Sequence, residues 1–100
     1  MVTTYGVGEL SAINAHAGAL AEQVPVIQIA GSPPLGNRNQ KGMIQHHTLG
    51  NYDYGVFSRI YQSVSVAQLV LTDVLTAASK IDDILLKCWL KAGPCTLNYL

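Results

Sequence analysis

The stretch TTYGVGELSAINA, residues 3–15, leads from an extended segment into a helix through a turn that contains two glycines. Residues 2–5 are β-branched and aromatic, which favours a strand, and Gly6 and Gly8 favour a turn. Apolar residues recur on one helical face over 9–22, so a helix is predicted there. A strand that turns into a helix at two glycines also offers free backbone amides to a ligand.

A dinucleotide-binding turn is one alternative for this motif. The fingerprint G-x-G-x-x-G needs a third glycine, but Ser11 stands at that position. The next strand is also followed by no acidic residue that could hold a ribose. The motif therefore argues against a nicotinamide site.

Strand and helix patterns continue outward from this turn. Residues 24–30 form a short apolar run that is typical of a buried parallel strand. A loop rich in glycine, proline and asparagine covers 31–42, and a short helix is expected at 54–61. Residues 95–100 are expected to form a last strand.

Two further helices are predicted before that strand. A capping box begins each of them, at Ser65 and at Ser79, and apolar residues follow at helical spacing, in the first as far as Leu75. Gly93, as the C′ residue, ends the second helix, with Pro94 behind it. The resulting order predicts an α/β fold, in which a parallel sheet has helices packed on its faces.

Composition limits the class of protein. Apolar residues make up 49% of the 100 residues and charged residues only 12%, so we expect neighbouring parts to cover some of the surface. Six basic and six acidic residues cancel, which argues against a nucleic-acid or anionic-lipid partner. No apolar run approaches the ~20 residues of a membrane span, and no signal peptide follows Met1, so a cytoplasmic location is expected.

The two cysteines have neither redox nor zinc spacing. Cys88 and Cys95 do not form a Cys-x-x-Cys motif, and no histidine lies near them in sequence. We expect both to be reduced, buried thiols.

Two adjacent histidines stand in MIQHHTLGN, residues 43–51. Helical metal pairs need a spacing of three or four, and no carboxylate or cysteine stands at ligand spacing, so no metal site is expected. In extended or turn backbone, His46 and His47 point to opposite sides, so one of them can face a pocket. On the residues alone, they are either site residues or ordinary loop histidines, and His16 is interpreted as structural.

Three stretches taken together resemble the pyruvate decarboxylase family of thiamine-diphosphate enzymes: TTYGVGELSAINA at 3–15, VPVIQIAGSP at 24–33 and HHTLGNYDYGVF at 46–57. The resemblance runs from Val2 to about Lys91, and HHTLGN is specific to 2-oxoacid decarboxylases. It implies that residues 1–100 are part of an N-terminal, Rossmann-like pyrimidine-binding domain, with the family's middle and C-terminal domains absent.

The resemblance also assigns site residues. The cofactor-binding set, expected to lie against the aminopyrimidine ring of thiamine diphosphate, is Thr4, Gly6, Val7 and Gly8. The catalytic residues are His46 and His47, which are expected to project toward the reacting carbon. Imidazole titrates near neutral pH, which suits proton transfer and alkoxide stabilisation. The family's reaction, that of a carbon–carbon lyase, gives an aldehyde and carbon dioxide from a 2-oxoacid such as pyruvate.

Other functional groups of the family do not occur in this chain. Its activating glutamate lies upstream of the matched segment, and the Gly-Asp-Gly motif for the diphosphate and magnesium belongs to the C-terminal domain. Magnesium is therefore implied by resemblance alone, and the isolated chain is expected to be inactive. The expected partners are a 2-oxoacid, the rest of the enzyme and a second subunit of a homo-oligomer, the last against the small-residue helix at 9–22.

Two positions depart from the family, and two alternatives remain open. Tyr52 stands where the family has glycine beside the histidine motif, and Asn98 stands where it has an apolar residue. One alternative is a truncated relative without catalysis. The other is a fragment of an aryl 2-oxoacid decarboxylase that acts on indolepyruvate or phenylpyruvate.

Overall fold

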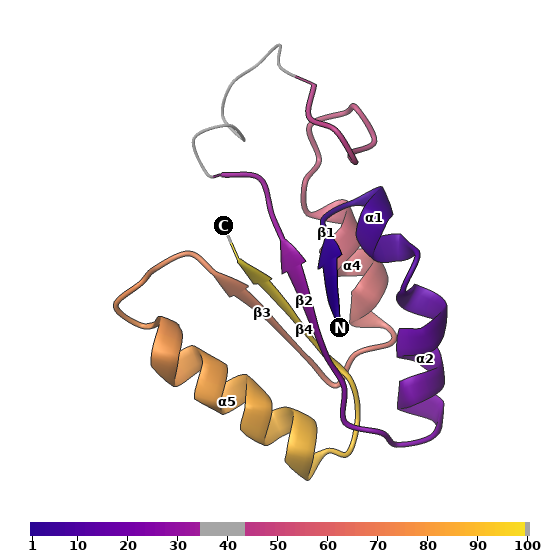
Figure 1. Cartoon of the computed structure of the whole chain (residues 1–100), viewed down its shortest axis with the longest axis vertical. Coiled ribbons are helices and arrows are strands. Elements are labelled where there is room, and N and C mark those ends of the chain that lie inside the picture. The colour runs from indigo at the N-terminus through magenta and orange to yellow at the C-terminus, as the bar shows by residue number, and fades with distance from the viewer. Residues whose placement is uncertain (35–43, 100) are drawn as a thin grey trace.

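The computed structural model describes residues 1–34 and 44–99, which form an α/β arrangement around a parallel sheet (Figure 1). The sheet order is β1-β2-β4-β3, with every neighbouring pair parallel. The strands are β1 (Val2–Thr4), β2 (Ile27–Gly31), β3 (Ala67–Leu71) and β4 (Cys95–Tyr99). The fold class predicted from the sequence is therefore confirmed.

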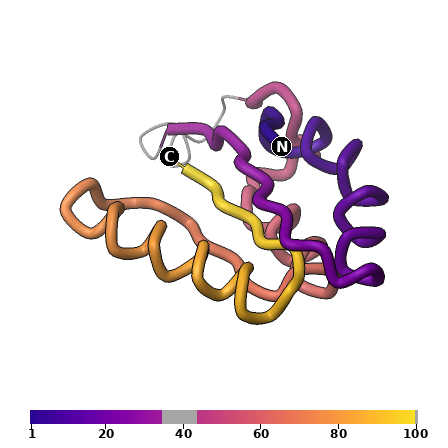
Figure 2. The backbone as a smooth tube through the Cα atoms, turned by 60° about the horizontal axis from the view of Figure 1, so that its bottom comes forward, coloured from indigo at the N-terminus to yellow at the C-terminus, as the bar shows by residue number. Residues whose placement is uncertain are grey.

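Helices cover both faces of the sheet, as Figure 2 shows from a second direction. One face carries α1 (Val7–Leu10), α2 (Ile13–Ala21) and α4 (Val56–Gln62), and the other carries α5 (Ala77–Leu90). None of the helices in the described ranges is both long enough and apolar enough to cross a membrane.

The face beneath α5 holds the apolar core. Its buried members are Ile84, Cys88, Cys95 and Leu97, and aliphatic side chains of β2 and β3 pack around them. Both cysteines are free and buried, as expected, and the pKa of the Cys95 thiol is raised to about 12, first by burial and then by Cys88. The outer face of α5 is apolar as well, with exposed Leu85, Leu86, Trp89 and Leu90.

The opposite face of the sheet buries polar side chains. Gln28 on β2, His16 on α2 and Tyr61 on α4 are each at most 2% exposed. The His16 ring lies edge-on to the Tyr61 ring at a centroid distance of 5.0 Å, and His16 Nε2 lies 2.9 Å from the Ser65 hydroxyl. His16 therefore has the structural environment that was expected for it.

The helix predicted from Ser65 to Leu75 is wrong, because this segment contains the edge strand β3. Its run AQLVL pairs along its whole length with β4, from Ala67 opposite Cys95 to Leu71 opposite Tyr99. Gln68, read as part of a capping box, instead donates its side-chain amide to the Ser58 carbonyl at 2.9 Å. A short apolar run fits a helix and a buried strand equally well, and pairing with β4 decides between them.

Helix boundaries also differ from the prediction. The helix expected over 9–22 begins at Val7 and is interrupted at residues 11–12, between α1 and α2. The last helix begins at Ala77, ahead of the expected capping box at Ser79, whose hydroxyl donates to the Thr76 carbonyl. The strands expected at 2–5, 24–30 and 95–100 and the short helix at 54–61 are all present, although most of the loop at 31–42 lies outside the described residues.

The C-terminal end of α5 differs in the identity of its C′ residue. Ala92, and not Gly93, has the left-handed backbone, with φ of 46°. The Gly93 amide donates to the Cys88 carbonyl and the Ala92 amide to the Trp89 carbonyl, which is the hydrogen-bond pattern of a Schellman motif. Gly93 is required for another reason, since a Cβ there would lie 2.5 Å from a methyl group of Val66.

Candidate functional site

The turn after β1 and the histidine loop meet through their backbones. The Val7 amide donates to the His47 carbonyl at 2.9 Å. Gly6 has φ of 72°, and a Cβ placed on it would lie 1.6 Å from the same carbonyl oxygen. The loop therefore needs a residue without a side chain at this position, and two segments far apart in sequence form one local structure.

The side chains around this junction bring most of the expected site residues together. A Cβ on Gly8 would lie 2.2 Å from Thr4 Cγ2 and 3.6 Å from His47 Nδ1. The Tyr5 ring stands edge-on to the His47 ring at 6.4 Å between centroids. Thr4, Gly8 and His47 thus surround one small region beside the turn.

His46 lies in the same turn of the loop, and both histidines are exposed. His47 has a left-handed backbone, with φ of 61°, which is uncommon for a residue with a side chain. In this conformation the His47 carbonyl group points toward Gly6 and accepts the Val7 amide. The conformation of His47 is therefore tied to the turn after β1.

The expectation of free amides at this turn is wrong for two of them. The Val7 amide is used by His47, and the Gly6 amide donates to the Glu9 carboxyl group. Both donors are satisfied inside the chain, so neither of these two amides is available to a ligand. The sequence pattern cannot indicate this, because His47 is far from the turn in sequence.

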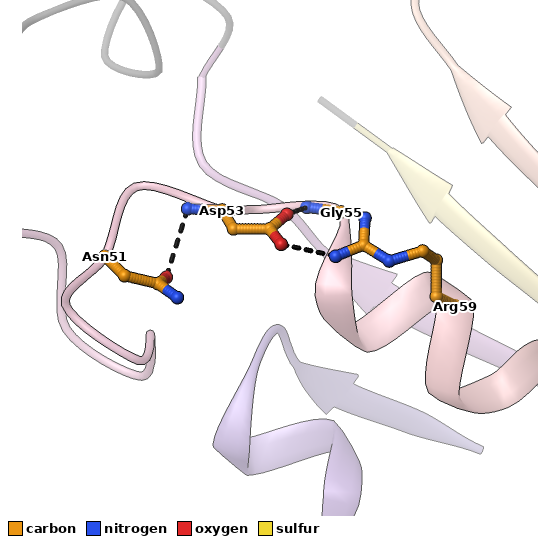
Figure 3. A network of polar contacts seen from close by, with 4 residues as sticks. All are labelled: Asn51, Asp53, Gly55 and Arg59. Atoms are coloured by element: carbon orange, nitrogen blue, oxygen red, sulfur yellow. Dashed lines mark hydrogen bonds and ion pairs between the residues drawn. The ribbon is translucent and has the colours of Figure 1, made fainter.

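The loop after the histidines is braced by side chains that accept backbone hydrogen bonds. Asn51 accepts from the Asp53 amide and Asp53 accepts from the Gly55 amide, each at 3.1 Å, and Arg59 forms an ion pair with Asp53 (Figure 3). The hydrogen bond from Arg59 is the largest of the effects that lower the pKa of the Asp53 carboxyl group. This network connects the loop to the first turn of α4, and Tyr52 lies inside it with φ of 62°.

A small cleft with a cavity volume of about 70 Å³ opens at the carboxyl ends of the strands. Parallel α/β sheets commonly bind ligands at this end. The lining includes Tyr5, Gly6, Glu9, Ser32, Tyr54 and Asn98. Asn98, the departure noted in the last strand, thus borders the cleft, while neither histidine does.

Glu9 is a buried carboxyl group at the position where the sequence predicts the start of a helix. Its exposed fraction is 4%, and burial raises its pKa to about 7, although the Gly6 amide acts in the opposite direction. Such a shift places its titration near neutral pH, where acid–base groups of functional sites often titrate. The available signal was a lone acid directly after the glycine turn, in a chain with few charges.

The residues beside the turn fit a small neutral ring better than a magnesium diphosphate. Thr4 and Gly8 present a methyl group and a bare backbone, and a Cβ on Gly8 would occupy that space. Within the ranges 1–34 and 44–99, no three histidine, cysteine or acidic side chains come together as metal ligands. The space beside Gly8 is therefore lined by uncharged groups, which suits a ring better than a charged group.

Comparison with known proteins finds related sequences, whereas no family model matches. The chain is 51% identical over 94 residues to a pyruvate decarboxylase of Aspergillus parasiticus and 48% identical over 95 residues to one of Aspergillus fumigatus. It is 42% identical over 94 residues to a thiamine metabolism regulatory protein of Saccharomyces cerevisiae. Each match covers 94% of this chain, but the chain spans only 15–16% of the length of these relatives.

Proposed function

Because the chain belongs to the pyruvate decarboxylase family by sequence, we propose that it is the part of a thiamine-diphosphate- and magnesium-dependent 2-oxoacid decarboxylase that holds the aminopyrimidine ring. Residues 1–100 would form part of an N-terminal pyrimidine-binding domain. The observation that carries the proposal is the junction of Thr4, Gly8 and His47, held by the hydrogen bond from Val7 to His47.

Each residue of the junction has a part in the proposed site. Thr4 and Gly8 would border the ring, Gly6 lets the His47 carbonyl approach closely, and Val7 fixes the histidine loop through its amide. When bound, thiamine diphosphate would supply a nucleophilic carbon for the 2-oxoacid carbonyl and a cationic ring that takes up the electron pair left behind when carbon dioxide departs. His46 and His47 hold or transfer protons at the substrate oxygen and carbon, which imidazole does well near neutral pH.

The remaining parts of the enzyme are supplied from outside the described site. Magnesium and the diphosphate would be bound by another domain, and the product would be an aldehyde. A second subunit would pack on α2, where Ala15, Gly18 and Ala21 are exposed and a Cβ on Gly18 would meet nothing within 4 Å. We place the assembled enzyme in the cytoplasm.

A relative without catalysis is the second candidate. The observation in its favour is the 42% identity to a protein named for the regulation of thiamine metabolism. In that case the same junction would bind the cofactor without turnover.

A chimera separates the two candidates. Residues 2–91 would replace the matching segment of an intact family decarboxylase, and the chimera would be assayed for 2-oxoacid turnover with thiamine diphosphate and magnesium. We expect turnover, and we expect His46→Ala or His47→Ala to lower it by roughly 10²–10⁴-fold. Gln45→Ala is the matched control in the same loop and should have little effect.

The outcomes have distinct meanings. A folded chimera that binds the cofactor but does not turn over supports the regulatory candidate. An active chimera in which both alanine variants keep full turnover per folded molecule removes the histidines from the site.

A further inference from the structure

Tyr61 connects α4 to the turn that carries the site. Its hydroxyl group is buried and donates to the backbone carbonyl of Glu9, in α1. The side-chain amide of Gln28, in the centre of the sheet, donates in turn to the Tyr61 hydroxyl at 3.0 Å. The tyrosine hydroxyl therefore both donates and accepts, and each bond has a partner on a different element.

Gln28 and the Tyr61 ring each make a further contact that restricts them. Gln28 is 1% exposed, and its amide also lies 3.5 Å from the Thr3 hydroxyl on β1. The edge-on contact with His16 restricts the Tyr61 ring from the other side. A hydrogen bond between buried, fixed groups is costly to leave unmade, so the Glu9 carbonyl has one favoured position.

The Glu9 carbonyl belongs to the same short segment that contacts the histidine loop. Gly6 accepts the Leu10 amide at 3.2 Å, which closes α1, and Val7 donates to the His47 carbonyl. The series of contacts runs from Gln28 through Tyr61 to α1 and then to His47.

We propose that Tyr61 is a positioning residue: its hydroxyl, oriented by Gln28, fixes the turn at residues 6–9 and thereby the placement of His47.

The hydroxyl and the ring of Tyr61 make separable contributions. The ring fills the core between α1, α2 and α4, and a phenylalanine ring would fill the same space. Of these two parts of Tyr61, the hydroxyl is the one that reaches the Glu9 carbonyl, which also accepts the Ala12 amide at 3.0 Å. The proposal therefore predicts a local change at the turn when the oxygen atom alone is removed.

Hydrogen exchange on the 100-residue chain tests this prediction. In Tyr61→Phe, exchange of the Val7 amide should become roughly tenfold faster relative to the Cys95 amide, the scale of one lost hydrogen bond. The Cys95 amide bonds the Val26 carbonyl at 2.8 Å between β2 and β4, so it reports opening of the whole sheet. Tyr99→Phe, which removes a hydroxyl from a half-exposed tyrosine at the end of β4, is the matched control and should leave the ratio unchanged.

Two results would overturn the proposal: an unchanged Val7 rate, or Val7 and Cys95 rates that rise by one common factor. If Tyr61→Phe does not fold, Gln28→Met provides the same readout, because it removes the amide that orients the hydroxyl. We expect a smaller shift in the same direction there, and an unchanged ratio would count against the relay.

The importance of His47 rests on the proposed function, but the exchange measurement does not. It requires neither cofactor nor substrate. A failed chimera together with a shifted Val7 ratio would leave the relay intact and remove the catalytic role. An active chimera with an unchanged Val7 ratio would support the catalytic role of the histidines and remove the positioning role of Tyr61.

Discussion

The carbonyl oxygen of His47 lies against Gly6 so closely that a Cβ on residue 6 would be 1.6 Å away. Both atoms belong to backbone, so a side chain cannot be accommodated by a change of rotamer. The turn after β1 and the histidine loop therefore depend on each other, and changes in either should be detectable in the other.

Gly6→Ala is expected to separate these two segments. The substitution combines a backbone clash with a left-handed φ of 72°, and we expect a loss of roughly 2–4 kcal/mol in the free energy of unfolding. Chemical denaturation of both variants measures it. Gly18→Ala is the control: nothing lies within 4 Å of its Cβ, and a gain of about 0.5–1 kcal/mol is expected for a helical site. Equal effects at the two glycines would contradict this account.

Tyr52→Gly should stabilise the loop, because Tyr52 has φ of 62°. The left-handed conformation costs a residue with a side chain roughly 1–2 kcal/mol. Glycine avoids this cost, but it also raises the conformational entropy of the unfolded chain, which offsets part of the gain. We expect a net gain of about 0.5–1 kcal/mol, read from thermal or chemical unfolding. Asparagine at the same position should be intermediate and valine worse than tyrosine, so any other order argues against strain.

Ala92→Gly should stabilise the end of α5 for the same physical reason. Ala92 has φ of 46° at the C′ position of a Schellman motif, where glycine is the usual residue. A gain of about 0.5–1 kcal/mol is expected. Lys87→Gly, at an exposed position inside α5, should instead cost about 1 kcal/mol, and a gain there as well would point to a cause other than the backbone angle.

Glu9 should make stability depend on pH. Its pKa is raised from 4.5 to about 7, so the folded state binds more protons between these values and stability falls as pH rises from about 4.5 through about 7. Screening by solvent reduces the effect, and we expect the free energy of unfolding to fall by roughly 1–3 kcal/mol over this pH range. Denaturation midpoints of the parent and Glu9→Gln, measured across this range, should converge at low pH and diverge above it.

Glu22→Gln, at an exposed carboxyl group, is the control and should keep the parent's pH profile. Burial lowers the pKa of His16, so this residue acts in the opposite direction, destabilising the fold as pH falls through its ordinary range near 6.5. The comparison is therefore made between variants at each pH. Identical profiles for parent and Glu9→Gln would show that the carboxyl group titrates normally.

The outer face of α5 should cause association of the isolated chain. Trp89 and Leu90 are 74% and 71% exposed, beside Leu85 and Leu86. Apolar patches of this kind favour contacts with other surfaces. Light scattering against concentration should show association that Trp89→Lys weakens. Ser79→Lys adds the same charge to the same helix without removing an apolar group, and an equal effect from it would attribute the change to charge.

The sequence predicts elements well where the local pattern is unambiguous. The strand at residues 2–5 and the helix after it follow from β-branched residues, a glycine turn and helical periodicity, and all are present. The strand β3 was missed because AQLVL reads equally as helix or strand until β4 pairs with it. The break near Ser11 and the left-handed Ala92 depend on how α1 and α5 pack, which no local signal records.

The candidate site was likewise predictable from the sequence only in part. The resemblance placed Thr4, Gly8 and His47 in one site, and the structure brings these residues together. The use of the Val7 amide by His47 and the buried bond from Tyr61 to Glu9 could not be predicted, because each joins segments that are distant in sequence. The burial of Glu9 and its contact with Tyr61 therefore follow only from the arrangement of the elements in space.

The sheet order has a consequence for how the chain folds during synthesis. β2 pairs along its length with β4, from Ile27 opposite Cys95 to Gly31 opposite Tyr99, so the central contact of the sheet joins nearly the two ends of this segment. Such pairings are slow, because loop-closure entropy is lost before they form. While the ribosome is still making β4, the edge of β2 that will pair with it has free backbone amide and carbonyl groups, and the incomplete sheet is a substrate for chaperones or for aggregation.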